Sequence, residues 1–249
     1  MVNGRKVSEV NTMYCSLILT IALSVTATHV QAALITNESS NLLSNPSFEP
    51  GTPAFLPPGV PGVDRWSEEN ADLIIGESFG IIPFEGNGMV RLNATGGVTS
   101  QLGQFIDVSS WAAEIDAGNL AVSLSALYNS STPGTIVSTL VVARSDVSYR
   151  GSSLIGGGTF ESNLTLDSSL ETWETVSLGV DNPVFLPSGT RFIDAEVIAI
   201  NNTIPNGAFV DAVDLRVASF QEVKVPEPAT ILGTATAIGC ILLKRKQAN

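Results

Sequence analysis

Short apolar runs that alternate with polar side chains constrain the fold of this chain more than any other feature. In the run NLAVSLSALY at 119–128, Leu120 and Leu124 would point to one side of a strand, while Ser123 and Ser125 would point to the other. A period of two with one polar face is typical of a strand in an antiparallel sheet that buries one face.

The same kind of run recurs along the chain, and glycine, proline, asparagine and serine separate the runs. The nine candidate strands are 71–76, 89–93, 101–108, 119–128, 135–143, 159–166, 171–180, 191–200 and 208–217. Residues 111–116 are predicted to form one helical turn. Nine short strands joined by turn residues predict an all-β fold, an antiparallel β-sandwich or jelly roll.

The first 32 residues have the pattern of a secretory signal peptide with a signal helix. Arg5 and Lys6 precede an uncharged, largely apolar run at 16–28, and Ala32 ends a small-residue cleavage pattern. We expect signal peptidase to cut after Ala32. The alternatives left open are an uncut signal anchor and a start at Met13.

The other end has the pattern of a short membrane segment. The motif VPEP precedes an apolar run at 229–243, and a basic cluster follows it. As a helix this run is about 22 Å long, a thin transmembrane span. Basic residues stay on the cytoplasmic side, so the body is expected outside. The expected sorting residues are Val225, Pro226, Glu227, Pro228, Lys244, Arg245 and Lys246.

The chain of 249 residues is therefore predicted to have four parts. They are a signal peptide at 1–32, a β-sandwich domain at 33–217, a short linker at 218–224 and a sorting and transmembrane segment at 225–249. The middle part is long enough for one domain with its own core.

The body is strongly acidic. Seven basic and 22 acidic residues lie between residues 33 and 224, which gives a formal net charge of −15. Such a surface repels phosphate backbones, so we expect no nucleic-acid partner.

The body also lacks cysteine and histidine, since Cys15, His29 and Cys240 all lie in the two ends. It can build no disulfide, no Ser-His-Asp triad, no thiol nucleophile and no ordinary zinc site. Gly156–Gly158 is predicted as a flexible turn and lacks the lysine of a phosphate-binding loop. We expect no enzyme activity. The catalytic alternative is a glycosidase that uses two carboxylates.

Two kinds of side chain could still bind a ligand. Trp66 and Trp111 could offer an apolar face to a sugar ring. Glu49 and Asp211 could share a calcium ion if the first and last strands are neighbours. In the alternative interpretation, the tryptophans fill the core and the carboxylates face solvent or a backbone turn.

The C-terminal 25 residues resemble the PEP-CTERM sorting signal. The match is VPEP, Ala229-Thr230, the apolar span and the terminal cluster at 244–246, in that order. This resemblance implies recognition and cleavage by an exosortase, a membrane enzyme similar to cysteine proteases. It also implies a bacterium with an outer membrane that makes extracellular polysaccharide or biofilm matrix.

The body resembles carbohydrate-binding modules of the galactose-binding-like jelly-roll type. The matching segments are NLLSNPSFE at 41–49, Trp66, Gly88 with 90–92, 101–106, Trp173 and FVDAVDL at 209–215. The resemblance implies a structural calcium between the first and last strands, at Glu49 and Asp211. Ala212 departs from the pattern, which has a second aspartate there.

Together these features predict an exported, exosortase-processed protein with a non-catalytic, carbohydrate-binding sandwich. The C-terminal helix would anchor it transiently in the inner membrane before it reaches the cell surface or the extracellular matrix. The expected partners are signal peptidase, exosortase and an extracellular polysaccharide. A structural or adhesin-like envelope protein without a specific ligand is the main alternative.

Overall fold

The computed structural model describes residues 32–51, 55–57, 60, 62–93, 99–148, 153–167, 169–200 and 206–223. Ile35–Gln221 form one compact unit, and the second unit combines Met1–Leu34 with Glu222–Asn249. The predicted signal and transmembrane helices lie outside the described residues. Within the described ranges, no helix is long and apolar enough to cross a membrane.

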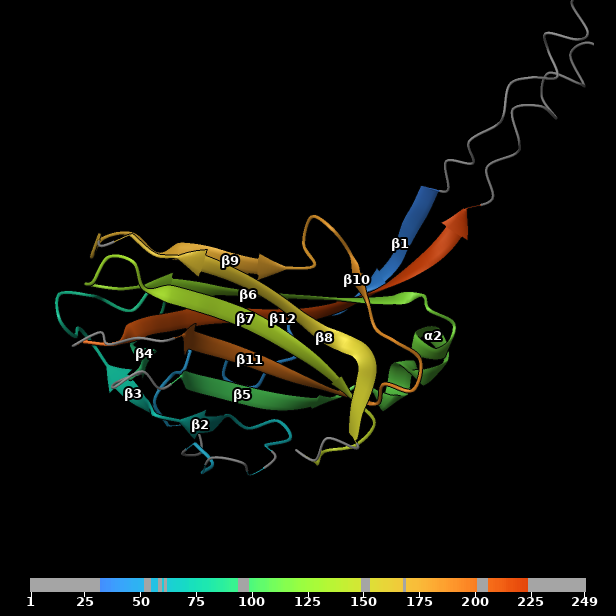
Figure 1. Ribbon diagram of the computed structural model, residues 1–249, viewed down its shortest axis with the longest axis horizontal. Helices are drawn as coiled ribbons and strands as arrows, with labels where there is room; N and C mark the ends of the chain where they lie inside the picture. The colour runs from blue at the N-terminus through green and yellow to red at the C-terminus, as the bar shows by residue number, and fades with distance from the viewer. Residues whose placement is uncertain are drawn as a thin grey trace, which may run out of the picture. The chain divides into compact units, whose positions relative to one another are not determined.

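The body consists of two antiparallel sheets packed face to face (Figure 1). The larger one, sheet A, has the strand order β10-β6-β12-β4-β3, with β1 also paired to β12 and β9 to β6. Its strands are β1 (Ala32–Glu38), β3 (Ala71–Ile75), β4 (Gly88–Leu92), β6 (Leu120–Asn129), β9 (Glu174–Leu178), β10 (Val184–Phe185) and β12 (Ala208–Val223).

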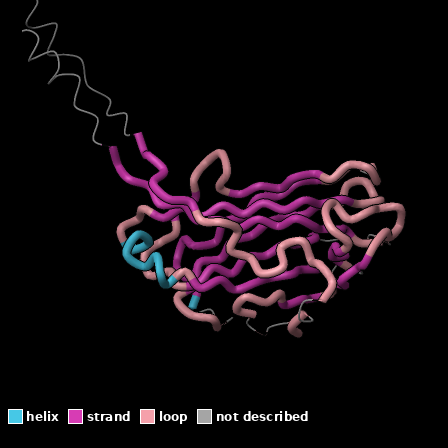
Figure 2. Tube along the Cα trace, turned by 180° about the vertical axis from the view of Figure 1, so that it is seen from behind, coloured by secondary structure: helices cyan, strands magenta, loops and turns pink. Residues whose placement is uncertain are grey.

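The smaller one, sheet B, has the order β2-β5-β11-β7-β8. Its strands are β2 (Ser67–Glu69), β5 (Ser100–Asp107), β7 (Ile136–Arg144), β8 (Leu154–Thr165) and β11 (Phe192–Ile200). A 3-10 turn at Ser109–Trp111 and helix α2 (Ala112–Asp116) connect β5 to β6. In Figure 2 this is the longer of the helix-coloured segments, and strands and loops make up nearly all the rest of the described body.

Side chains that alternate inward from both sheets form one apolar core. On β6 the inward residues include Leu120 and Leu124, and on β11 they include Ile193 and Val197, all fully buried. Tyr128 is the largest fully buried side chain, and its hydroxyl donates a hydrogen bond to the carbonyl of Ser138 at 2.6 Å. The core therefore comes from the period-two pattern, and a buried phenol is tolerated because its proton has a partner.

The structure confirms the all-β sandwich, the nine predicted strands and the helical turn. It adds β1, β2 and β10. The flexible turn predicted at Gly156–Gly158 is wrong, because these glycines lie within β8. Gly157 has a φ of +75°, and the register of β8 on β7 shifts between Val142 and Arg144. The glycines therefore form an irregularity in a strand.

Candidate functional site

The outer face of sheet A is small and polar where β6 and β12 run side by side. On β6, Leu124 is buried while Ser123 and Ser125 are half exposed on the opposite face. The register places Asp214 of β12 beside Ser125, and Arg216 beside Ser123. Because serines are short, the two strands leave a hollow between the charged pair and the neighbouring elements.

This hollow is the floor of a groove of about 470 Å³. Its lining comes from four segments that are distant in sequence, within residues 35–38, 121–125, 177–183 and 214–220. The volume falls in the range of small-molecule sites, which are concave and combine apolar walls with a few placed polar groups.

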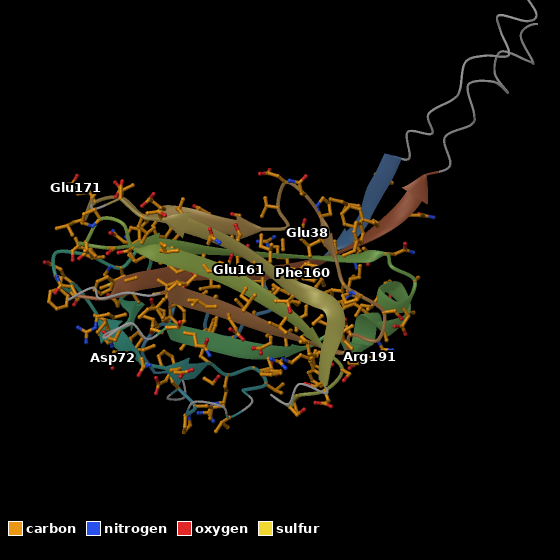
Figure 3. The ribbon with its side chains drawn as sticks, in the orientation of Figure 1. Glu38, Asp72, Phe160, Glu161, Glu171 and Arg191 are labelled. Carbon is orange, nitrogen blue, oxygen red and sulfur yellow. The ribbon has the colours of Figure 1, made fainter. Side chains whose placement is uncertain are left out.

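The polar groups of the groove form an ion-pair network around Arg216. Its Nε donates to the Asp214 carboxylate, at 2.9 Å from Oδ2, and its Nη1 lies 3.8 Å from Oε1 of Glu38. Glu38, labelled in Figure 3, is the last residue of β1. All three side chains are at least one-third exposed. Exposed pairs of this kind add at most about 1 kcal/mol to stability, so their donors and acceptors can exchange partners with a ligand.

Gly179 shapes the rim of the groove. Its φ is +76°, and a Cβ atom at this position would lie 2.2 Å from the carbonyl oxygen of Val122. Only glycine tolerates both the left-handed backbone and this close approach. The turn from Val180 to Pro183 can therefore rise as a wall directly beside β6.

One end of the groove carries an aromatic pair. Phe220 of β12 lines the groove, and its ring centroid lies 5.3 Å from that of Phe185 on β10, at an interplanar angle of 64°. Edge-to-face pairs fix ring orientation. Phe185 is exposed and Phe220 half-buried, so apolar ring surface is open at this end.

The two carboxylates predicted as a calcium pair, Glu49 and Asp211, converge on the loop that connects β3 to β4. Oδ2 of Asp211 accepts hydrogen bonds from the backbone N–H groups of Phe84 and Glu85, at 2.8 and 3.1 Å. We call residues 76–87 the β3–β4 loop.

Glu49 holds the far end of the same loop. Its Oε1 accepts hydrogen bonds from the N–H groups of Asn87 and Gly88, at 2.8 and 3.3 Å. Asp211 of β12 and Glu49, which precedes β2, thus fix the C-terminal part of the β3–β4 loop and its junction with β4.

Asp211 has an unusual environment for an acid. It is fully buried, and this burial raises the pKa of its carboxyl to about 6. The backbone hydrogen bonds from Glu85, Ala212 and Phe84 act in the opposite direction and lower the pKa. The nearby Glu85 carboxylate also raises the pKa. The hydrogen bonds therefore offset only part of the desolvation.

Calcium binding between Glu49 and Asp211 stays a prediction from the sequence. In the structure, Oε1 of Glu49 and Oδ2 of Asp211 each accept two backbone N–H groups from residues 84–88. The structure shows these carboxylates as anchors of the loop.

The tryptophans predicted to meet a ligand lie away from the groove. Trp66 is 4% exposed, packs 5.3 Å from the ring of Phe48 and donates its Nε1–H to the carbonyl of Asn45 at 3.1 Å. It belongs to the core and has no face open to a sugar. Trp111 is half-buried and packs on the edge of the core.

The predicted sorting residues, at 225–228 and 244–246, lie outside the described residues. Ala32, the predicted cleavage position, is the first residue of β1. Export, cleavage and sorting remain predictions from the sequence.

Sequence reasoning missed the groove. Ser123 and Ser125 were recognised as the polar face of a strand, but nothing in the sequence places Arg216 beside them. A signal did exist on β12, where Asp214 and Arg216 alternate with buried Val213 and Leu215. This alternation marks an outward polar face but does not say which strand it borders.

No protein-family model matches this chain, and no curated protein matches it either. Several solved structures are similar to it at a distance. An apo-form cyclase from Fischerella sp. has 12% sequence identity and a TM-score of 0.46, and the match covers 72% of this chain and 96% of that one. A protein of Bacteroides thetaiotaomicron named "putative sugar binding protein" has 12% identity and a TM-score of 0.43, covering 70% and 98%.

The CBM22-1–GH10 modules of Clostridium thermocellum xylanase 10B, complexed with xylohexaose, have 14% identity and a TM-score of 0.37. This match covers 61% of the present chain and 25% of the xylanase chain. These similarities are distant, and the class of fold, an all-β sandwich of two antiparallel sheets, rests on the strand pairing itself.

Proposed function

We propose that this chain is an exported, non-catalytic protein whose sandwich binds an extracellular polysaccharide in the groove on sheet A. The observation that carries the proposal is the groove itself. Serine hydroxyls and the Asp214–Arg216–Glu38 network supply hydrogen bonds for sugar hydroxyls, and Phe220 supplies an apolar ring face. A concave site with a few polar groups around apolar surface suits a sugar chain.

The charge of the protein narrows the class of glycan. With a formal net charge of −15 between residues 33 and 224, the body repels polyanions, and the groove itself contains Glu38, Asp181 and Asp214 against Arg216. We therefore expect neutral polysaccharides to bind better than uronic-acid polymers, most clearly at low salt, where repulsion is least screened.

Affinity electrophoresis and calorimetry of the full chain against β-glucan, xylan, galactan and alginate test the proposal. Arg216→Ala should weaken binding about tenfold or more, because it removes hydrogen bonds from a charged donor. Ser123→Trp should abolish binding by filling the floor of the groove. The matched control is Arg191→Ala, which also removes an exposed arginine paired to a carboxylate, here Asp116 at 2.7 Å, outside the groove.

Three results would contradict the proposal. Failure to bind any of the four polymers would favour a structural envelope protein without a ligand. Equal affinity of wild type, Arg216→Ala and Ser123→Trp would place binding elsewhere. New reducing ends in the bound polymer, lost in Asp214→Asn, would indicate a glycosidase.

We also propose that export uses the two ends of the chain, since each carries its own sorting pattern. Mass spectrometry of the protein recovered from a host that contains exosortase should show a mature N-terminus at residue 33 and a C-terminus near 225–228. Recovery of the intact tail from such a host would argue against exosortase processing.

A further inference from the structure

The β3–β4 loop covers the opposite end of the same face of sheet A. Its residue Ile81 is fully buried against Met89 of β4 and Phe209 of β12, and Ile74 and Trp173 pack around this small cluster. The cluster lies on the outer face of sheet A, because the neighbouring Val90 and Val210 point into the main core.

Large apolar side chains stand exposed on this loop. Ile82 is 64% exposed, Phe84 53% and Phe79 49%. The ring of Phe84 meets that of Trp173 edge to face, with centroids 6.3 Å apart, and Trp173 Nε1 donates to the carbonyl of Ile82 at 3.2 Å. This end of sheet A therefore carries a second edge-to-face aromatic pair, comparable to the pair at the groove.

The loop that carries Phe84 is fixed before any ligand arrives. Asp211 holds the backbone of Phe84 itself, Glu49 holds the loop end, and Ser78 and Ile81 exchange two backbone hydrogen bonds at 2.9 Å. A pre-ordered aromatic side chain loses little conformational entropy on binding.

The two aromatic pairs lie near opposite ends of β12, on the same outer face of sheet A. Along β12, Asp211 anchors the loop beside Leu127 of β6, and Asp214 is the next residue to pair with β6, beside Ser125. The distance from Asp214 to Phe220 is six residues, about 20 Å of extended strand. Figure 3 shows Glu171 at one end of the sandwich and Glu38 well away from it, toward the side of β1.

We propose that the outer face of sheet A binds an internal stretch of a linear polysaccharide several units long, with Phe84 and Trp173 as a second anchor beyond the groove. This inference rests on the proposed function and names its substrate class. A site for a single sugar or a chain end would need one closed pocket. Here the groove is open, and a second pair of rings lies on the same face of sheet A, outside the residues that line the groove.

The test compares the full chain with Phe84→Ala, using oligosaccharides of two and six units from whichever of β-glucan, xylan or galactan the wild type binds. The six-unit probe should bind wild type at least tenfold more tightly than the two-unit probe. Phe84→Ala should weaken binding of the six-unit probe about fivefold to tenfold, the strength of one aromatic contact, and leave the two-unit probe unchanged.

Two further variants keep the test decisive. Phe84→Tyr retains the ring and should bind as wild type does. Ile136→Ala removes an exposed apolar side chain from sheet B and should change neither affinity. Equal melting temperatures of wild type and Phe84→Ala would show that the fold is intact.

The outcomes separate the two proposals. No binding of any polymer overturns the proposed function. Equal affinity for the short and long probes, or an unchanged six-unit affinity in Phe84→Ala while Arg216→Ala still loses binding, overturns only the two-anchor inference. Loss of binding to both probes in Phe84→Ala would make the loop the main site and also overturn it.

Discussion

Glu196 and Asp194 lie two residues apart on β11 and share the outer face of sheet B with Arg144. Asp194 is fully buried. Its Oδ2 accepts a hydrogen bond from Arg144 Nε at 3.1 Å and forms an ion pair with Nη2, also at 3.1 Å. No N–H group of the described residues donates to its other oxygen, Oδ1. Burial first, and the Asp194 carboxylate second, raise the pKa of Glu196 to about 8, so Glu196 carries a proton that it donates to Asp194 at neutral pH.

This proton makes stability depend on pH. An unfolded glutamate ionises at its ordinary pKa of about 4.3, whereas folded Glu196 ionises only near 8. The unfolded state therefore loses its proton first, and folding stability falls as pH rises from about 4.5 to about 8. Burial also raises the pKa of Asp194, to about 6, which adds a fall in the lower part of this window.

Glu196→Gln should remove the larger part of this dependence. An amide keeps a donor toward Asp194 and cannot ionise. We expect wild type and variant to melt alike near pH 4.5, and the variant to melt several degrees higher near pH 8, at about 2–4 °C per kcal/mol for a chain of this size. Thermal melts across the pH range measure this effect. Parallel melting curves at all pH values would show that Glu196 is ionised in the folded protein.

At the residue scale, the sequence indicated which face of a strand a side chain occupies. It did not indicate which side chain of another strand lies beside it. In FIDAEVIAI, the acidic residues alternate with Ile193, Ala195 and Val197, so their common outward face could be predicted. The partnership with Arg144 could not, because it depends on β7 lying beside β11. Glu49 and Asp211 show the same limit. Their convergence could be proposed from the sequence, but the backbone groups that they bind could not.

The β3–β4 loop shows how one element depends on another. Its backbone N–H groups at Phe84 and Glu85 are satisfied by a side chain of β12, about 126 residues further along the chain. A loop held in this way has a local stability set by the sheet below it.

Asp211→Ala should therefore loosen this loop. It leaves two N–H groups without their acceptor, at a cost of about 1–3 kcal/mol. Hydrogen exchange should accelerate at Phe84 and Glu85, and much less at the centre of β6. Asp211→Asn is the matched control, because its carbonyl oxygen still accepts hydrogen bonds and its stability loss should be smaller. Equal exchange rates in Asp211→Ala and wild type would mean that the loop is held by other contacts.

Among whole elements, the sequence predicted nine strands and missed β1, β2 and β10. β6 alternates between buried and half-exposed residues from Val122 to Tyr128. β2 and β10 have only three and two residues, too few for any period to appear. β8 was shortened to its regular part, because Gly156–Gly158 has the composition of a turn and only the pairing with β7 keeps these residues in the sheet.

The whole molecule combines a neutral core with a surface of one dominant charge. Between residues 33 and 224, 22 acidic residues outnumber seven basic ones, and this excess of negative charge repels itself when folding brings it together. Added sodium chloride screens this repulsion. The melting temperature at pH 8 should therefore rise between 10 and 200 mM salt. A fall over this range would mean that local ion pairs such as Arg191–Asp116 outweigh the net charge.

The candidate site belongs to this largest scale, which explains why the sequence did not reveal it. The order of strands in sheet A brings together β1, β6, β12 and the turn that follows β9. This order is a property of the assembled core. Composition could predict the acidic character and the lack of cysteine and histidine in the body, since these are sums over residues. The groove, in contrast, depends on which strands are neighbours in the sheet.

The pairing of β12 has a mechanical consequence. The same strand forms the floor of the groove and leads toward the C-terminal end of the chain. If that end is held while a bound polymer pulls on the groove, the load runs lengthwise along β12. The hydrogen bonds to β6 lie across this direction. These hydrogen bonds would be loaded in shear, all at the same time, and would not break one after another. The paired strands β6 and β12 would therefore resist this tension.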